Sequence, residues 1–232
     1  MKELDMPSAL ITGGTRGLGR ALATALAKRN WRVVVDGRSQ AAIKTLVAEM
    51  DGEIVGVVGD VTDPFHRIAL VEAVGARLDL LVNNASELGP SPLLPLHQIP
   101  SDAVTRIFEV NVHAPLALIQ ALLPSLAKAS GVVVNLSSDA AVEAYDGWGA
   151  YGASKAALDQ LSAVLAVENP TLSTYAFDPG DMRTDMHQAA FPGEDISDRP
   201  LPETVVPALL RLVESRPASG RIRATDLLAE VN

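Results

Sequence analysis

The chain has 232 residues, of which 48% are hydrophobic and 20% are charged, and this balance is typical of a compact globular protein. A chain of this length can bury a stable core as one α/β domain, so we expect a single domain over residues 1–232. The formal net charge of −9 repels phosphate backbones and argues against a nucleic-acid partner. The absence of cysteine excludes disulfides, cysteine nucleophiles and thiolate zinc sites.

Local features of the sequence argue against a metal-binding protein and against a secreted or membrane protein. The four histidines have no helical metal-ligand spacing, so we expect no metal site. The apolar stretch before Gly13 is too short for a signal-peptide core or a membrane span. We therefore expect a cytoplasmic protein that does not contact membranes.

Short apolar runs alternate with amphipathic segments along the chain. Valine runs at 33–35 and 132–134 lack inside–outside alternation, as parallel strands do when helices cover both faces. We expect strands at Ala9–Thr12, Arg32–Asp36, Ile54–Val58, Leu78–Val82, Val132–Leu136 and Thr174–Phe177, with a weak seventh near Arg221–Ala224. We expect helices at Leu18–Arg29, Ala41–Met50, Phe65–Ala76, Ala103–Leu126, Gly152–Val167 and Glu203–Glu214. This order predicts an α/β fold, a doubly wound Rossmann-type parallel sheet of six or seven strands with helices on both faces.

The first strand is followed by T-G-G-T-R-G-L-G, residues 12–19, which opens the first helix. Glycines there permit a tight turn and close backbone approach, and a helix N-terminus attracts a pyrophosphate. This context favours dinucleotide binding. An ordinary tight turn is the alternative for this motif alone, because the spacing is G-x-x-x-G-x-G and not the commoner G-x-G-x-x-G.

The glycine spacing resembles the cofactor turn of the short-chain dehydrogenase/reductase family, T-G-x-x-x-G-x-G. Further motifs of that family follow later strands in the same order. Asp60-Val61 resembles its adenine-contacting pair, and Asn83-Asn84-Ala85 resembles its N-N-A-G motif, with Ser86 in place of the last glycine. Pro179-Gly180, with Thr184 four residues on, resembles its nicotinamide-binding turn.

The candidate catalytic residues also come from this resemblance. Tyr151 and Lys155 supply Y-x-x-x-K, and Ser138 stands thirteen positions before the tyrosine. Asn111 lies inside a long helical segment, where the family has an asparagine that interrupts the helix and holds a water.

Each motif has an ordinary explanation by itself, such as a chance tyrosine–lysine pair, an asparagine turn or a serine cap. Their shared order along successive strands is not explained that way. The resemblance implies that Asn111, Ser138, Tyr151 and Lys155 are catalytic. It implies that the cofactor is bound by Gly13, Thr15, Arg16, Gly17, Leu18, Gly19, Arg38, Asp60, Val61, Asn84, Ala85, Tyr151, Lys155, Pro179, Gly180 and Thr184.

The side-chain types fit acid/base chemistry. A free phenol has a pKa near 10, so a neighbouring positive charge is needed to bring Tyr151 toward the working pH. Lys155 is one helical turn away and can supply that charge. In carbonyl reduction Tyr151 would donate the proton while the Ser138 hydroxyl stabilises the substrate oxygen, and the nicotinamide supplies the hydride. The resemblance also implies that Lys155 bonds the nicotinamide ribose.

The choice of cofactor depends on residues 36–38, Asp-Gly-Arg. NAD-dependent enzymes place an acid near this point, whereas an arginine accommodates the 2′-phosphate of NADP. Gly37 aligns with the usual acid and Arg38 follows it, and Arg16 offers a second guanidinium. We expect NADP(H). NAD(H) is the less favoured alternative, in which Asp36 would reach the ribose and both arginines would be solvated.

The substrate is expected to be a small-molecule carbonyl or alcohol with apolar character. Two loop-like stretches, Glu87–Pro100 and Phe191–Pro202, are expected over the site, with a lid between Asp181 and Pro202. A candidate apolar wall comprises Leu93, Leu94, Val142, Tyr145, Trp148, Met182, Met186 and Phe191, although several of these residues could instead pack loops onto the core.

The C-terminal segment departs from the family because it lacks the closing Asp-Gly-Gly, which puts the seventh strand and the usual tetramer contacts in doubt. We expect a homodimer, through the two long helices, or a homotetramer.

The sequence therefore predicts an NADP(H)-dependent oxidoreductase that transfers a hydride between the cofactor and a carbonyl or alcohol. One alternative is a cofactor-sensing regulatory protein on the same fold without turnover, which would not need a phenol and an ammonium aimed at nicotinamide. A nucleotide-sugar epimerase or dehydratase would usually need a larger C-terminal domain than this chain offers. An interaction module with vestigial motifs is the third alternative.

Overall fold

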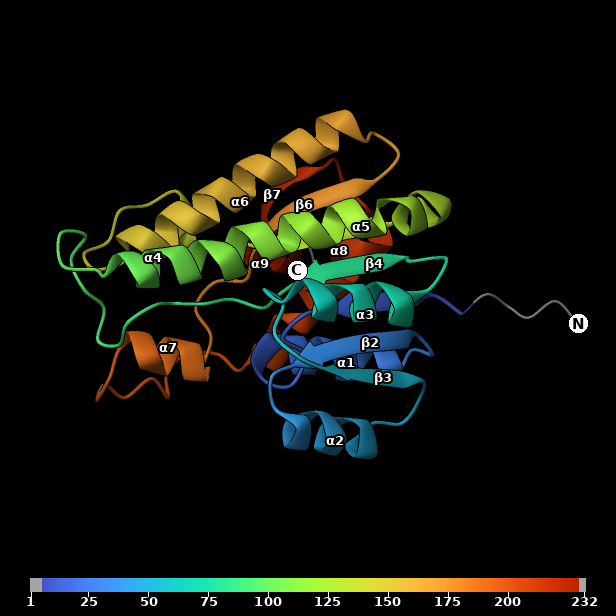
Figure 1. Cartoon of the computed structure of the whole chain (residues 1–232), viewed down its shortest axis with the longest axis horizontal. Coiled ribbons are helices and arrows are strands. Elements are labelled where there is room, and N and C mark those ends of the chain that lie inside the picture. Colours follow the sequence, from blue (N-terminus) through green and yellow to red (C-terminus); the bar gives the residue numbers. More distant parts are fainter. Residues whose placement is uncertain (1–5, 230–232) are drawn as a thin grey trace, which may run out of the picture.

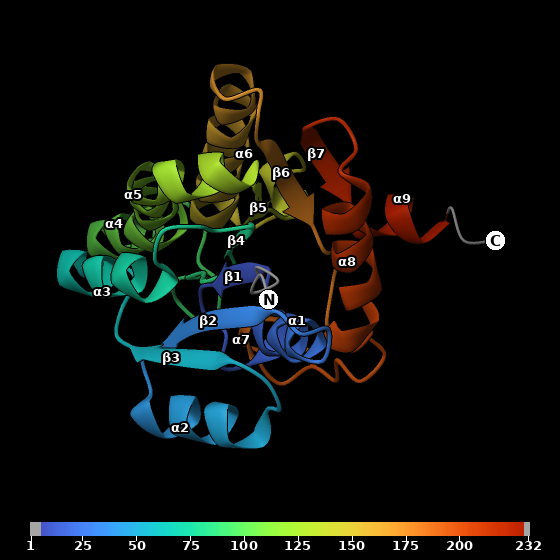
Figure 2. The same cartoon turned by 90° about the vertical axis from the view of Figure 1, so that its right-hand side faces the viewer.

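A seven-stranded parallel sheet forms the centre of the molecule, with the strand order β3-β2-β1-β4-β5-β6-β7. The computed structural model, shown in Figures 1 and 2, describes residues 6–229. The strands are β1 Ser8–Ile11, β2 Arg32–Gly37, β3 Ile54–Val58, β4 Leu80–Asn83, β5 Val132–Leu136, β6 Ser173–Asp178 and β7 Gly220–Arg223. All neighbouring pairs are parallel. The predicted doubly wound Rossmann-type fold is confirmed.

Helices cover both faces of the sheet. One face packs against α1 Gly17–Ala27, α2 Gln40–Glu49 and α8 Val206–Ser215, and the other packs against α3 Pro64–Val74, α5 Ala114–Ala129 and α6 Gly149–Glu168. In Figure 2 α3 and α5 lie on one side of the sheet and α1 and α8 on the other. The residues of β1, β4 and β5 are buried on both sides of the sheet, which is why their sequences do not alternate, whereas the edge strands β3 and β7 are only partly buried.

The strand order reverses direction at β1, which has β2 on one side and β4 on the other. The chain crosses to opposite faces of the sheet on leaving these strands, so a crevice opens beyond their carboxyl ends. The segments after β1, β4, β5 and β6 all reach this edge. The fold therefore gathers polar residues that are far apart in sequence.

The long predicted helix Ala103–Leu126 is not continuous. It comprises α4 Ser101–Phe108, a π-helical turn Glu109–His113 and α5. A π-helical turn accommodates an extra residue and is often found at functional sites. Asn111 lies in the middle of this turn and is buried.

Residues 101–129 together are long and apolar enough to cross a membrane by length and composition alone. Half of that apolar window is buried inside the protein. Packing against α3, α6 and the sheet explains the composition of the segment as that of a core helix.

Other differences lie near the C-terminus. The doubtful seventh strand is present, and β7 pairs in parallel with β6. Two short helices were not predicted, α7 Asp185–Ala190 within the expected lid and α9 Ala224–Ala229 after β7. Both are only about two turns long, and the apolar periodicity of so short a segment is weak. The remaining predicted elements differ from the observed ones by a few residues at their ends.

Candidate active site

A cavity of about 990 Å³ opens at the carboxyl edge of the sheet. Segments that follow β1, β2, β3, β4 and β6 line it, together with the first turns of α6. Most of the residues predicted to bind the cofactor are in this lining: Gly13, Thr15, Arg16, Gly17, Leu18, Arg38, Asp60, Val61, Asn84, Ala85, Tyr151, Lys155, Pro179 and Thr184. Their positions fit an extended ligand that crosses the sheet edge.

The turn after β1 depends on glycines because two of its residues have positive φ angles. Gly13 and Gly17 have φ of +64° and +54°, a region that L-residues with side chains rarely adopt. The Thr12 hydroxyl accepts hydrogen bonds from the backbone N–H groups of Asn84 and Ala85, both at 3.0 Å. The turn after β1 is therefore tied directly to the turn after β4.

Gly19 has a packing role and does not line the cavity. A Cβ atom there would lie 2.5 Å from the Asn84 side chain and 2.6 Å from the Gly13 carbonyl oxygen. The third glycine of the motif thus lets α1 approach the turn closely. Gly180 also lies outside this cavity and lines a second one, described below.

Asp36 is buried beneath the glycine turn and is fully engaged there. Its carboxylate accepts a hydrogen bond from the backbone N–H of Gly13 at 2.6 Å and lies 2.9 Å from Nε2 of His66. It is 1% exposed. In the alternative in which Asp36 binds the ribose of NAD, the carboxylate would have to share its two oxygens with these partners.

Gly37 and Arg38 complete the edge of this part of the cavity. A Cβ atom on residue 37 would lie 2.6 Å from the Thr15 methyl group, so a larger residue there would require the Thr15 side chain to move, and position 37 carries no acid of the kind that NAD-dependent enzymes have. Arg38 is exposed and lines the cavity. This edge offers a cation to the cofactor and no free carboxylate.

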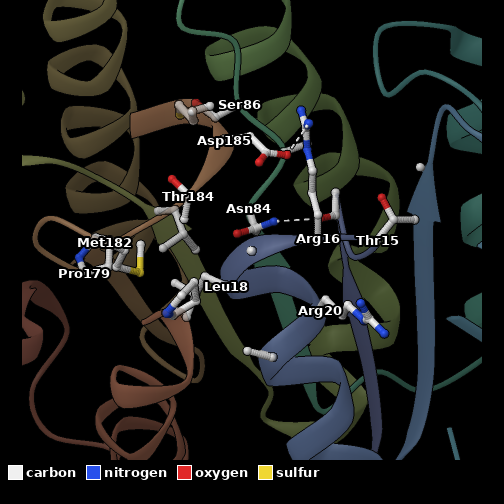
Figure 3. Close-up of a pocket in the computed structure, with 18 of the residues that line it drawn as sticks. Thr15, Arg16, Leu18, Arg20, Asn84, Ser86, Pro179, Met182, Thr184 and Asp185 are labelled. Atoms are coloured by element: carbon white, nitrogen blue, oxygen red, sulfur yellow. Dashed lines mark hydrogen bonds and ion pairs between the residues drawn. The ribbon is translucent and has the colours of Figure 1, made fainter. Parts of the chain in front are cut away.

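Arg16 bridges the cavity instead of pointing freely into it. Its guanidinium donates to the Asp185 carboxylate at 3.0 Å, and both side chains are well exposed. Figure 3 shows this ion pair with Thr184 and Met182 nearby on the other wall. The glycine turn and the first residue of α7 are therefore joined across the opening.

Asp60 is held as a carboxylate by its surroundings. Burial raises its pKa, but hydrogen bonds from the Thr62 backbone and from Arg106 outweigh that effect and lower the pKa to about 2. Arg106 comes from α4 and also donates to the Thr62 hydroxyl at 2.7 Å. This network fixes the loop that presents Val61 to the cavity.

Tyr151 and Lys155 reach the cavity from the start of α6, as two side chains one turn apart should. The Lys155 ammonium donates to the Leu136 carbonyl oxygen at 2.6 Å and lies 5.5 Å from the centroid of the Tyr151 ring. Both residues are buried in the protein, since Lys155 is 2% exposed and Tyr151 is 8% exposed. Ser138 follows β5 and lines the adjoining second cavity together with Tyr151.

Comparison with known proteins matches this arrangement. Residues 7–195 fit the profile of the family described as short chain dehydrogenase. The chain belongs to the short-chain dehydrogenases. The uncharacterized oxidoreductase YciK of Escherichia coli is 31% identical over 224 residues, which cover 91% of this chain and 88% of that protein.

Two other relatives extend the comparison. Sepiapterin reductase of Bos taurus is 32% identical over 199 residues, 78% of this chain and 74% of that protein. A solved short chain dehydrogenase of Shigella flexneri complexed with NADP has a TM-score of 0.86 and 29% identity, and the match covers 94% of this chain and 97% of that one. The protein is thus an oxidoreductase of the short-chain dehydrogenase family.

Burial shifts the pKa values of Tyr151 and Lys155 in this dehydrogenase. Burial raises the pKa of Tyr151 to about 12, with smaller contributions in the same direction from Asp139 and Asp178, while hydrogen bonds with Ser86 and Ser138 lower it. Burial also lowers the pKa of Lys155 to about 8. Tyr151 is therefore a protonated phenol at neutral pH. A pKa of Tyr151 that Lys155 brings toward the working pH stays a prediction.

Asn111 lies in the π-helical turn, and its side chain makes four hydrogen bonds to residues outside that turn. Its amide nitrogen donates to the Glu87 carbonyl oxygen and to the Ser154 hydroxyl, both at 2.9 Å. Its amide oxygen accepts from the Glu87 backbone N–H at 2.7 Å and from the Ser86 hydroxyl at 3.2 Å. The side chain thus fixes the segment after β4 against α6, and its predicted role in holding a water stays a prediction.

The second cavity, of about 450 Å³, adjoins Ser138 and Tyr151. The Ser138 hydroxyl donates to the Asp139 carboxylate at 2.9 Å, so it must rotate to donate to a substrate oxygen. Of the predicted apolar wall, Tyr145, Trp148, Met182, Met186 and Phe191 line this cavity, whereas Leu93, Leu94 and Val142 do not. Leu93 instead packs against the cluster that contains Tyr151.

Four residues gain importance only from the structure. Arg106, Asp185, His66 and Ser86 contact predicted site residues but belong to no motif that marked them as ligands. For Ser86 a signal existed, because it replaces the last glycine of N-N-A-G. The described residues contain no group of three or more His, Asp or Glu side chains that could hold a metal ion.

Proposed function

We propose that this short-chain dehydrogenase reduces a small carbonyl compound with NADPH, with Tyr151 as the proton donor. The observation that carries the proposal is the meeting of a protonated phenol, an ammonium and a glycine turn at one cavity. A phenol that is protonated at neutral pH supports donation to the oxygen that becomes negative as hydride arrives. Nicotinamide, when bound, supplies that hydride.

Each residue has a definite part in this proposal. Tyr151 transfers its proton to the substrate oxygen, and Ser138 turns its hydroxyl from Asp139 to the same oxygen. Lys155 donates to the Leu136 carbonyl oxygen and has further N–H groups for a cofactor ribose. Water is excluded by the cluster of Leu88, Trp148, Met186 and Phe191 around the phenol.

The preference for NADPH is supported by Arg38 and Arg16 at the cavity, by the hydrogen-bonded Asp36 carboxylate and by the absence of an acid at Gly37. The Shigella relative was solved with NADP. A cytoplasmic location and a homodimer or homotetramer remain predictions. Exposed Val164 and Val167 on α6 give an apolar surface that is consistent with association.

The test is a screen of carbonyl compounds and alcohols with purified protein, following nicotinamide absorbance with NADPH and NADH separately. Tyr151→Phe removes the proton donor and should lower kcat about 100-fold or more, with cofactor affinity by fluorescence titration nearly unchanged. Cofactor binding without turnover of any compound would favour the sensing protein. Wild-type turnover by the phenylalanine variant would refute the role of Tyr151.

A further inference from the structure

His66 is a buried imidazole that is linked to the glycine turn through Asp36. It lies on α3 and is 6% exposed, and its Nε2 atom is 2.9 Å from Oδ2 of Asp36. The other carboxylate oxygen, Oδ1, accepts the backbone N–H of Gly13 at 2.6 Å. The three residues thus form a chain of hydrogen bonds from α3, through the end of β2, to the turn after β1.

The space for this imidazole comes from a glycine in the wall of the cofactor cavity. A Cβ atom on Gly59 would lie 2.2 Å from His66 Nδ1, so a side chain at position 59 would displace the ring. Gly59 and Asp36 both line the 990 Å³ cavity, whereas His66 does not. The imidazole therefore packs against the residues that form the wall without reaching the cofactor space itself.

Asp36 stands next to the position at which the two nicotinamide cofactors differ. In the proposed function this edge of the cavity receives the adenosine ribose, which carries a 2′-hydroxyl in NADH and a 2′-phosphate in NADPH. A carboxylate accepts hydrogen bonds from ribose hydroxyls and repels a phosphate. The effect of Asp36 on cofactor choice therefore depends on which donors its two oxygens already have.

The imidazole gives Oδ2 a strong donor before any cofactor is bound. A carboxylate can only accept, so Nε2 of His66 is the nitrogen that carries the hydrogen in this contact. A hydrogen bond to a charged oxygen is roughly twice as strong as one between neutral groups. With the Gly13 N–H on Oδ1, a ribose hydroxyl would have to share an oxygen with one of these two donors.

We propose that His66 is a positioning residue for cofactor choice, which holds the Asp36 carboxylate beneath the glycine turn and thereby favours NADPH over NADH. This inference rests on the proposed function and extends its cofactor preference to a residue outside the cavity lining. Without the imidazole, Oδ2 loses its donor, and the cost of a buried carboxylate oxygen without a partner turns it toward the cavity. There it accepts from the ribose of NADH and repels the 2′-phosphate of NADPH.

The test measures the dissociation constants of NADPH and NADH by fluorescence titration, which requires no turnover. His66→Leu keeps an apolar side chain of similar size and removes the donor. In this variant NADPH should bind about ten-fold more weakly, whereas NADH should bind as tightly as in the wild type or more tightly. His66→Gln offers an amide N–H in place of the ring N–H and should restore most of the NADPH affinity.

A matched control separates the carboxylate from the packing of the ring. In the Asp36→Asn background no carboxylate remains to be released, so the further change His66→Leu should alter the ratio of the two dissociation constants less than about two-fold. The same change of ratio with and without Asp36→Asn would overturn the proposal. Equal weakening of both cofactors by His66→Leu would also overturn it, because the imidazole would then act by packing alone.

Thermal melting of each variant without cofactor shows whether it is folded at the temperature of the titration. If His66→Leu is not folded there, His66→Met gives the same comparison with a more adaptable apolar side chain. The titrations also keep this inference separate from the proposed function. A change in the ratio of the dissociation constants, in a protein that turns over no carbonyl compound or alcohol, would support the role of His66 and refute only the proposed reaction.

Discussion

Arg38 is the residue on which the proposed preference for NADPH depends most directly. Its exposed side chain follows the end of β2, next to Gly37, which stands where NAD-dependent enzymes carry an acid. Guanidinium groups bind phosphate through several N–H donors at once. NADPH carries a 2′-phosphate that NADH lacks, so Arg38 should contribute to the affinity for one cofactor and not the other.

We expect Arg38→Ala to weaken NADPH binding about ten-fold, as the loss of one charge-assisted hydrogen bond would, and to change NADH binding less than about two-fold. Fluorescence titration measures both. Lys44→Ala on α2 is the control, because it removes the same charge from a residue outside the cavity. Equal weakening of both cofactors would contradict the assignment of NADP(H).

Single residues also show how far sequence reasoning extends. Tyr151 and Lys155 could be paired from their spacing alone, because one helical turn separates them. The pKa of the phenol could not be predicted, because it depends on burial by side chains from distant segments such as Leu88 and Phe191. The hydrogen bonding of the Asp36 carboxylate likewise depends on His66, which is thirty residues away in sequence.

The short helix α7 is the element that links the expected lid to the glycine turn. Thr184 caps it by accepting from the His187 N–H at 3.2 Å, and Asp185 in its first turn pairs with Arg16. An exposed ion pair contributes little, at most about 1 kcal/mol. The pair nevertheless occupies one of the two guanidinium groups to which we assign the 2′-phosphate in the proposed function.

Removing this competition should favour the phosphorylated cofactor. We expect Asp185→Asn to tighten NADPH binding about two- to three-fold without changing NADH binding, as measured by titration at low ionic strength. Asp198→Asn is the control, because it removes the same charge from the lid but Asp198 pairs with Arg199 and not with Arg16. This variant should leave the ratio of the NADPH and NADH dissociation constants unchanged. An equal increase in NADH affinity would show that Asp185→Asn acts through the overall charge of the lid and not through the 2′-phosphate.

At the scale of the whole molecule, β7 ties the C-terminal segment to the active-site wall. Its Arg221 donates to Asp159 of α6 at 3.1 Å, and to Asp178 at the end of β6 and the Ser138 carbonyl oxygen, both at 2.9 Å. Both carboxylates are poorly accessible, at 15% and 6% exposure. One guanidinium thus links the middle of α6 to the end of β6 and to the segment after β5.

Arg221→Met should lower the free energy of unfolding by about 2 kcal/mol, because two carboxylates would lose their cation; the value is reduced from that of a fully buried pair since the arginine is partly exposed. Urea denaturation measures the change. Arg223→Met on the same strand is the control, because that residue is half-exposed and its pair is a long one, at 3.7 Å. Similar losses in both variants would contradict a special role for Arg221.

The sequence by itself determined the parallel sheet, its order of strands and helices, and the residues that follow each strand, because apolar runs and glycine turns act locally. The tertiary structure decided what those residues do to one another. It joined Ser86 to Asn111, Asp36 to His66 and Arg16 to α7, and it paired β7 with β6. These outcomes arise from contacts between segments far apart in the chain, and local sequence patterns carry no information about such distances.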